Sequence, residues 1–484
     1  MSQLKQTAPL WRFVLGVVTP KSTCRLTANT STRWFRSVPA AKYHHHHSHD
    51  RRRHCPCRRH QTCHYSSQSV SPSSRSAAPP SFTPMAFGLG APQAALTENG
   101  PRYEYVPFSD SCSIRILTLE PGVGDEPLVG SLRFENLGGR PDFEAISYVW
   151  GSGTRSAEMR CDGRLLPLTR SVYDALRRMR DPTRPRRLWA DQVCINQDDV
   201  AERSQQVNLM NQIFKGARHI LVWLGPDHDG VARAAVAMVH RLHGIFADDE
   251  KHEAFQRAHS EGLQQQDGDA WVPLSKLTKL PWFSRIWIVQ EIGTVTPATL
   301  HWGDEELDWE VLSSVVDVLS QKYHYLRSRF RVLTPSVRYL YRRFVHPDDD
   351  DRAGPDYCPA TNSLASFIYQ LHRARHLLAS DPRDHLYAFL GHFSKYTGSK
   401  ALADIKADYS RPVKDIFYDL AIRELEGTDS LLILSACYQE PFLSRRNLDS
   451  DLGLPSWVPD WRRSALHMLS SPVSPHRAAG DSRP

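Results

Sequence analysis

The chain has 484 residues, of which 40% are hydrophobic and 23% charged, and this composition is typical of an ordinary soluble protein with several domains. Its net charge of +7 is uneven: residues 1–97 hold 13 lysines and arginines and one acid, Asp50, whereas the remainder holds 47 basic and 52 acidic residues. A mildly acidic body argues against nucleic-acid binding, and no stretch reaches the roughly 18 uncharged apolar residues that a membrane span requires.

Residues 1–100 predict a disordered basic leader and linker, because Ser, Pro, Arg and His dominate and 70–84 is low in complexity. The scarcity of acids is compatible with a mitochondrial presequence, although Pro9 and Pro20 would interrupt its helix. A leader that is not a genuine part of the protein would explain the same composition. The histidines and cysteines between 44 and 64 match no structural zinc spacing, so we predict no metal site.

The cysteines after the leader are odd in number and widely spaced, with no CxxC pair. This pattern favours buried free thiols in a reducing compartment, and hence a cytoplasmic protein, over a disulfide framework. These cysteines are Cys112, Cys161, Cys194, Cys358 and Cys437.

Order is expected to begin near Tyr103. Asp162-Gly163 is a dipeptide typical of tight hairpin turns, and Asp181-Pro182 is expected to end a helix. The elements predicted up to this point are strands at 114–117 and 143–151, a hairpin at 159–166 and a helix at 171–180.

The stretch 187–225 predicts a strand, a helix and a second strand, which together form a βαβ unit with a parallel sheet. Asp199 followed by Glu202 has the form of a capping box at the start of the helix. The apolar positions Val207, Met210, Phe214 and Ala217 share one helical face. Because ligands gather at the C-terminal ends of parallel strands, Asp191, which follows the first strand, is a candidate functional carboxylate.

The second half of the chain is predicted to be mainly helical. Asp381, Arg383 and Asp384 form a charged group that we interpret as an interdomain clamp, with Asp384 as a candidate N-cap. The expected segments are a helix at 231–246, a polar insertion at 251–268, an aromatic segment at 280–292, a turn at 301–309, a helix at 312–319, an acidic boundary loop at 347–358, helical segments at 365–378 and 416–425, a buried segment at 431–436 and a last ordered segment at 454–461.

Three stretches, FEAISYVWG (143–151), RLWADQVCINQ and its continuation (187–225) and LPWFSRIWIVQEI (280–292), resemble the fungal heterokaryon-incompatibility (HET) domain. The later DPRDHLYAFLG and LPSWVPDW resemble the region commonly attached to such domains. One departure is Ala190-Asp191-Gln192 where the family usually has Ile-Asp-Ala, and the acid is kept. Relatives usually continue beyond LPSWVPDW, so the C-terminal region is expected to be truncated.

The resemblance implies a signalling or effector module in fungal non-self recognition and regulated cell death, acting through protein partners or self-association. It also implies a distant kinship with Toll/interleukin-receptor (TIR) domains, and hence an α/β fold with a TIR/flavodoxin-like parallel sheet flanked by helices. Some TIR domains cleave NAD with a Glu in a W-x-x-x-E arrangement, and Trp287–Glu291 has this form. By this match Glu291 is the candidate catalytic residue, with NAD as substrate and no bound cofactor.

Each candidate also has a structural interpretation. Glu291 could stabilise an oxocarbenium-like centre, or it could form a salt bridge with Arg285. Asp191 could bind a ribose, or it could close its strand by accepting backbone N–H groups. The other ligand-binding candidates are Ser147, Trp150, Asn196 and Trp287, for which core packing or, at Asn196, an Asx-turn offers an alternative. Cys194 is expected to be a packed small residue and not a nucleophile.

These observations predict a leader at 1–100, a HET (TIR-like) domain at 103–330 and a helical C-terminal region at 355–465. Two functions stay open: an incompatibility-type signalling module, and an NAD glycohydrolase that uses Glu291.

Overall fold

A computed structural model describes residues 100–259, 268–341, 343–345, 366–397, 400–427, 431–437, 452–464 and 469. All of them belong to one compact unit. The predicted leader and the acidic loop at 347–358 lie outside the described residues, as does most of the second half of the predicted insertion at 251–268.

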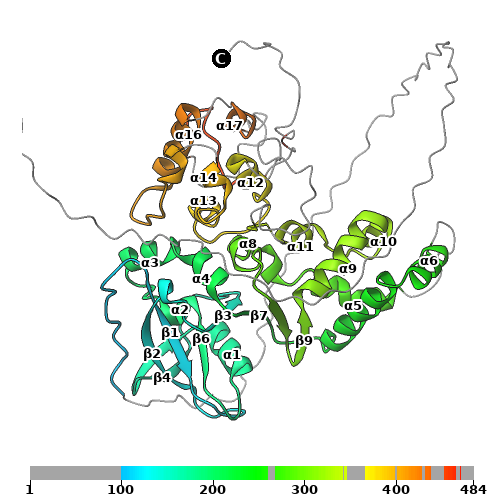
Figure 1. Ribbon diagram of the computed structural model, residues 1–484, viewed down its shortest axis with the longest axis horizontal. Coiled ribbons are helices and arrows are strands. Elements are labelled where there is room, and N and C mark those ends of the chain that lie inside the picture. Colours follow the sequence, from blue (N-terminus) through cyan, green and yellow to red (C-terminus); the bar gives the residue numbers. More distant parts are fainter. Residues whose placement is uncertain are drawn as a thin grey trace, which may run out of the picture. The chain divides into compact units, whose positions relative to one another are not determined.

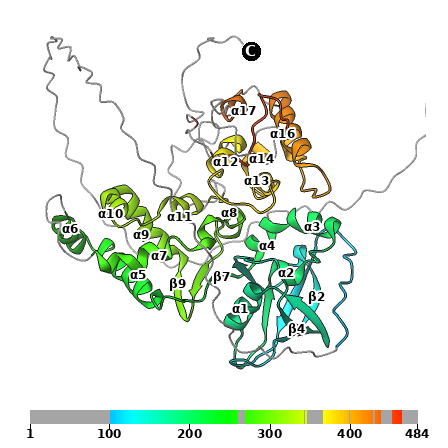
Figure 2. The ribbon, with the colours of Figure 1, turned by 180° about the vertical axis from the view of Figure 1, so that it is seen from behind.

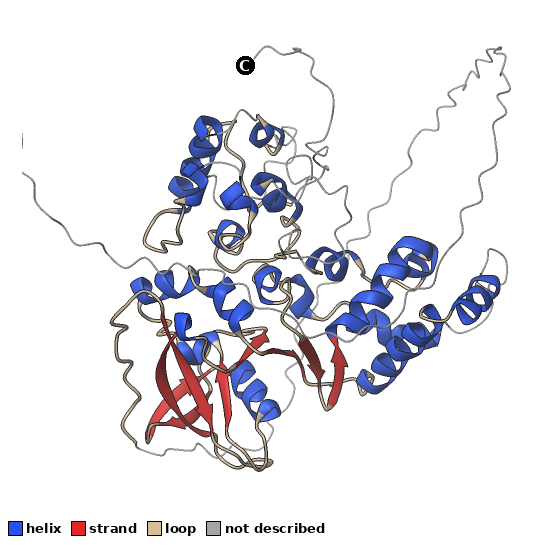
Figure 3. Ribbon diagram, viewed as in Figure 1, coloured by secondary structure: helices blue, strands red, loops and turns tan. Residues whose placement is uncertain are grey.

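Nine strands form one sheet in the order β5-β4-β2-β1-β6-β3-β7-β8-β9 (Figures 1 and 3). The strands are β1 Ser113–Leu119, β2 Val129–Asn136, β3 Glu144–Tyr148, β4 Ala157–Cys161, β5 Arg164–Leu168, β6 Arg186–Trp189, β7 His219–Gly225, β8 Ala298–Trp302 and β9 Glu305–Asp308. Every residue of β3 and the five central residues of β7 are buried, as expected of strands covered on both faces.

The sheet is mixed, whereas the sequence predicted a parallel one. The predicted βαβ unit is present: β6 and β7 both run parallel to β3, which lies between them, and β8 runs parallel to β7. The β1–β2, β1–β6, β4–β5 and β8–β9 pairs are antiparallel. The β4–β5 turn consists of Asp162 and Gly163, whose φ angles are 49° and 76°, and such a two-residue turn permits only antiparallel pairing.

The helices confirm most predicted segments, and three differ from the prediction (Figure 2). The segment 431–436 was predicted to be buried, but only Ile433 and Ala436 are buried. The segment 301–309 was predicted as a turn but forms most of the β8–β9 hairpin, and α6 within the predicted insertion buries no residue. The helices that precede β8 in the chain are α1 Arg170–Met179, α2 Asp191–Cys194, α3 Val200–Val207, α4 Met210–Gly216, α5 Ala232–Phe246, α6 Asp249–Ala258, α7 Val272–Leu277 and α8 Ile288–Glu291. The helices that follow β9 are α9 Trp309–Lys322, α10 His324–Arg329, α11 Pro335–Leu340, α12 Phe367–Arg373, α13 Asp384–Tyr387, α14 Ser394–Thr397, α15 Lys400–Ala403, α16 Val413–Gly427 and α17 Leu432–Ser435.

The helix predicted in the βαβ unit is divided into α3 and α4 at Asn208. The Asn208 amide donates from Nδ2 to the carbonyls of Ser204 (2.7 Å) and Ala407 (3.3 Å), and its Oδ1 accepts from the Ala407 N–H (2.9 Å). A side chain that bonds backbone groups competes with the helical ladder. The predicted apolar face is nonetheless buried, and Phe214 packs edge-on against Trp189 of β6.

Within the part of the chain that the structure describes, no helix combines the length and the apolar character needed to traverse a bilayer.

Candidate functional site

Four of the six candidate residues meet where β3 ends: Ser147, Trp150, Asp191 and Glu291. The chain passes from β3 to β6 on one side and then crosses back to β7 on the other, so the strand order reverses direction at β3. In open parallel sheets, ligands bind at the C-terminal edge beside such a reversal. Ser147 and Tyr148 are the last residues of β3, and Asp191 follows β6 directly after Ala190.

Asp191 joins the ends of β3 and β6. Its carboxylate accepts from the Tyr148 hydroxyl (2.7 Å), the Trp150 indole N–H (2.8 Å) and the Gln192 backbone N–H (2.7 Å). Burial and then the Asp191 charge raise the pKa of Tyr148 well above its usual value, so the phenol stays a donor. The strand-closing interpretation of Asp191 therefore applies, and it extends to the two aromatic side chains at the end of β3.

Glu291 lies against the opposite face of β3. Ser147 Oγ donates to Glu291 Oε2 and itself accepts from the Trp282 indole N–H (2.7 Å). The Arg285 guanidinium donates to both carboxylate oxygens, at 3.3 and 3.4 Å. The residue is 3% exposed, and burial raises the pKa of its carboxyl against the opposing effects of Arg285 and Ser147. The sequence-based salt-bridge interpretation thus holds, together with a serine contact that the sequence did not predict.

The two carboxylates form a polar junction around the last residues of β3. The nearby Asp191 charge contributes to the raised pKa of Glu291, so the two groups interact electrostatically although they bond different faces of the strand. Both oxygens of Glu291 already accept hydrogen bonds. Arg285 and Ser147 therefore compete with any ligand for this buried carboxylate.

Trp287 contacts the C-terminal region. Its indole N–H donates to Asp384 Oδ2 (2.9 Å), and Asp384 Oδ1 accepts from the Tyr409 hydroxyl (2.6 Å). Burial raises the pKa of Asp384 to about 7. Asp384 is 7% exposed and accepts from side chains, so its predicted role as an N-cap was wrong.

The predicted charged group around Asp384 does connect separate segments. Arg383 pairs with Asp381 (2.6 Å) and donates to the carbonyls of Tyr409 and Arg411. Together with the Trp287 contact, these bonds join α8, α13 and the segment before α16.

Asn196 and Cys194 have structural partners. Asn196 Oδ1 accepts from the Asp198 N–H (3.3 Å), which is the predicted Asx-turn. Cys194 is fully buried, and burial raises the pKa of its thiol to about 12, so it is no nucleophile at neutral pH.

Only the Asp199 half of the predicted capping box forms. Asp199 Oδ1 accepts from the N–H groups of Ala201 and Glu202, as in a cap. The Glu202 side chain points inward and pairs with Arg115 (2.6 and 2.9 Å), and Glu202 also accepts from the Asn196 N–H. Sequence reasoning missed this buried pair because its members are 87 residues apart, and local spacing carries no signal for such a contact.

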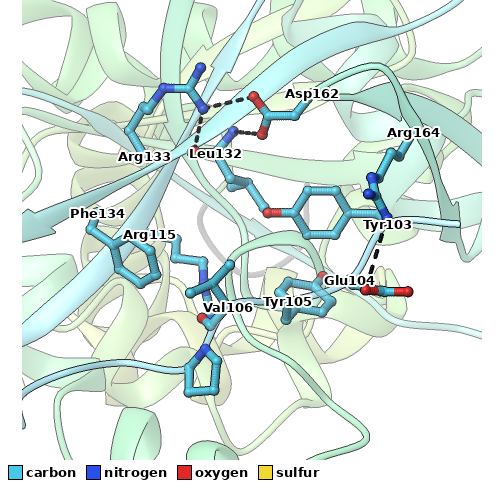
Figure 4. A pocket seen from close by; sticks show the side chains of 11 residues that line it. Tyr103, Glu104, Tyr105, Val106, Arg115, Leu132, Arg133, Phe134, Asp162 and Arg164 are labelled. Carbon is cyan, nitrogen blue, oxygen red and sulfur yellow. Dashed lines mark hydrogen bonds and ion pairs between the residues drawn. The ribbon is translucent and has the colours of Figure 1, made fainter.

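Arg115 also lies in a pocket of about 510 Å³ on the β1–β2 side of the sheet (Figure 4). Its guanidinium carbon is 4.1 Å from the Phe108 ring centroid, which is cation–π geometry. The side chains labelled in Figure 4 include Tyr103, Tyr105, Phe134, Asp162 and Arg164. None of the predicted site residues lines this pocket. Among the described residues, no group of three or more His, Cys, Asp or Glu side chains has the arrangement of a metal site.

Comparison with known proteins identifies the domain around this junction. The family described as Heterokaryon incompatibility protein (HET) matches residues 143–291. The chain contains a HET domain. Ser147, Asp191 and Glu291 all lie within the matched range, and Asp384 lies beyond it.

The similarity to curated proteins extends past the HET domain. The chain is 27% identical over 422 residues to heterokaryon incompatibility protein 6, OR allele, of Neurospora crassa. The aligned part is 74% of this chain and 59% of that relative, so the chain spans less than two thirds of the relative's length. No solved structure matches the chain.

Proposed function

We propose that this chain is a heterokaryon-incompatibility-type protein, a signalling and effector module in fungal non-self recognition and regulated cell death. The observation that carries the proposal is that the three stretches resembling a HET domain meet at the end of β3. Ser147, Asp191 and Glu291 come from these three stretches and bond β3 or one another. The similarity to the Neurospora crassa incompatibility protein supports the same function.

In this proposal the junction holds the HET domain in its signalling conformation, and protein partners or self-association trigger it. The contact between Trp287 and Asp384 would transmit a change in the C-terminal region to α8, which carries Glu291. Cys161, Cys194 and Cys437 are free thiols, which supports a cytoplasmic location.

The test is induced expression of the full chain in a filamentous fungus, with colony growth and uptake of a viability dye as measurements. We expect cell death with the natural sequence and its loss with Asp191→Ala, because this change removes the acceptor shared by Tyr148 and Trp150. Asp174→Ala in α1, whose partner is the exposed Arg170, is the matched control and should still kill. Equal protein levels must be verified by immunoblot. If Asp191→Ala kills cells to the same extent as the natural sequence, the proposed role of the junction is contradicted.

The alternative is NAD cleavage by Glu291. One observation favours it: a buried carboxyl of raised pKa contacts a serine hydroxyl at the sheet edge where ligands bind. Purified full chain at high concentration would be assayed for nicotinamide release, with Glu291→Gln beside it. Release that disappears in Glu291→Gln would establish an NAD glycohydrolase. If neither protein cleaves NAD and Glu291→Gln still kills cells, the NAD glycohydrolase alternative is refuted. The signalling module then remains as the proposed function.

We also propose the TIR/flavodoxin-like relationship for the parallel part of the sheet. Numbered along the chain, β3, β6, β7 and β8 have the spatial order 2-1-3-4. Flavodoxin-like sheets begin with this order. On this basis the HET domain would extend over about 103–330, and the helical region over about 355–465.

A further inference from the structure

A second pocket, of about 510 Å³, lies toward the beginnings of β3 and β7, away from the Ser147–Glu291 contact. Glu144 opens β3, and His219, its partner in the register, opens β7. Thr299 of β8 pairs with Leu221 of β7, and His301 of β8 pairs with Glu306 of β9. These side chains lie on the same face of the sheet as His219. The lining residues are Glu144, Arg178, Arg186, Arg218, His219, Leu221, Thr299, His301 and Glu306. Adjacent strands thus present one row of polar side chains to a single cavity.

His301 is the unusual member of this row. It is 5% exposed, lines the cavity, and neither ring nitrogen has a hydrogen-bond partner among the described residues. Its Nδ1 lies 3.4 Å from Glu306 Oε1 without forming a hydrogen bond. Buried polar groups in folded proteins are almost always paired with protein, water or ligand atoms. An imidazole without a hydrogen bond in the wall of a cavity therefore indicates a partner that enters the cavity.

The charges around the cavity indicate the sign of that partner. Three guanidinium groups line it against two carboxylates, those of Glu144 and Glu306. Arg186 pairs with Glu144 (2.7 Å) and Arg178 with Glu306 (2.8 Å). The half-exposed Arg218 pairs with Asp142 (2.9 Å), which does not line the pocket, and also lies 3.3 Å from Glu144. Each guanidinium has five N–H donors, so these ion pairs do not exhaust them.

Burial keeps both histidines of this row neutral. Burial, followed by the Arg178 charge, lowers the pKa of His301 to about 4. Burial also lowers the pKa of His219, whose Nε2 lies 2.9 Å from Thr299 Oγ1. A neutral imidazole still offers one N–H donor. The cavity therefore presents guanidinium and imidazole donors at once.

We propose that this pocket binds the phosphate group of a small phosphomonoester, with His301 as an N–H donor and Arg178, Arg186 and Arg218 as the charged wall. Phosphate accepts several hydrogen bonds through oxygens that match the guanidinium fork. The cavity volume falls within the range of small-molecule sites. The proposal is independent of the function assigned to the HET domain, because no residue of the Ser147–Asp191–Glu291 junction lines this pocket.

The first test is titration of the purified full chain with inorganic phosphate by isothermal calorimetry. We expect saturable binding that weakens by about tenfold or more in His301→Leu and in Arg218→Ala, since each removes a donor to a charged group. His243→Leu and Arg233→Ala are matched controls outside the lining and should bind as the natural chain does. Absence of saturable binding, or equal affinity in natural chain and His301→Leu, would overturn the proposal. If His301→Leu does not fold, Arg218→Ala decides, because its side chain is 51% exposed.

A second measurement uses the imidazole itself. In protein with isotope-labelled histidine, the His301 signal, assigned by its loss in His301→Leu, should show a pKa that rises from about 4 when phosphate is added. A bound anion favours the imidazolium form. An unchanged pKa at saturating phosphate would place the anion elsewhere and overturn the assignment.

A third arm identifies the source of the phosphate. Phosphatidylcholine vesicles with and without phosphatidic acid are sedimented with natural chain and His301→Leu. Binding to phosphatidic acid that requires His301 would support a lipid phosphate, whereas binding of inorganic phosphate alone would support a soluble ligand. Binding to both vesicle types, with no dependence on His301, would contradict a phosphate-specific pocket.

Discussion

The buried Asp384 carboxyl should make the stability of this protein fall as pH rises toward 7. Its pKa is raised from 3.8 to about 7 by burial, whereas the hydrogen bonds from Tyr409 and Trp287 act in the opposite direction. Between these two values the folded protein keeps a proton that the unfolded chain has lost. The contribution of Asp384 to the free energy of unfolding is therefore fully present below pH 3.8, decreases through pH 7 and is constant above it.

The magnitude follows from the size of the shift. About three pKa units correspond to about 4 kcal/mol over the whole range, of which about 3 kcal/mol falls between pH 5 and pH 7. Asp384→Asn removes the titration and keeps an oxygen that can accept from the Trp287 indole N–H. The difference in stability, natural chain minus Asp384→Asn, should therefore decrease by about 3 kcal/mol from pH 5 to pH 8.

Urea unfolding of both proteins at the two pH values measures this difference. Asp381→Asn is a matched control of opposite sign, because the bonds from Arg383 outweigh burial and leave the pKa of Asp381 lowered. Asp381→Asn should lower the stability at pH values above the usual carboxyl pKa, where the Asp381 carboxylate is charged in both states, and should not lower it at pH values below the folded pKa. A change of less than about 0.5 kcal/mol for Asp384→Asn between pH 5 and pH 8, within the uncertainty of extrapolation, would refute the reasoning.

Three other predictions concern the core of the HET domain. Glu202→Ala should destabilise the protein by about 3–5 kcal/mol, because it leaves the Arg115 charge buried without its partner, and denaturant unfolding would reveal it. Tyr148→Phe should cost about 1–3 kcal/mol through the lost hydrogen bond to Asp191, and an unchanged midpoint would show that this bond contributes nothing. Cys194 should resist alkylation at pH 8 until the chain is unfolded, and mass spectrometry of the native protein would detect any earlier modification.

Local sequence signals predicted the elements well where spacing alone determines structure. Asp162-Gly163 adopts the left-handed turn that its dipeptide favours, and Asp199 caps α3 through backbone N–H groups two and three residues away. The apolar face of the βαβ helix is buried as its spacing predicted. These features depend on contacts within a few residues, so periodicity and capping rules are sufficient to find them.

Other features of the site depended on distant partners. Asn208 divides the predicted helix because its amide bonds Ala407, 199 residues away. Glu202 left its expected capping role for Arg115, and Asp384 faces Trp287 and Tyr409 instead of the first turn of α13. In each case a buried or half-buried polar side chain bonds a partner that the tertiary fold supplies, and removal from water makes that pairing stronger than the local alternative.

By itself the sequence predicted the parallel core, its hairpin and capping turns, and the placement of Ser147 and Asp191 at the ends of strands. Only the tertiary structure decided that β1 pairs antiparallel with β2 and β6, that Glu291 is bonded by Ser147 and Arg285, and that a buried His301 without a hydrogen bond among the described residues lines a cavity. The physical reason is range: backbone geometry and hydrophobic periodicity act over a few residues, whereas burial and charge pairing depend on which distant segments the fold brings together.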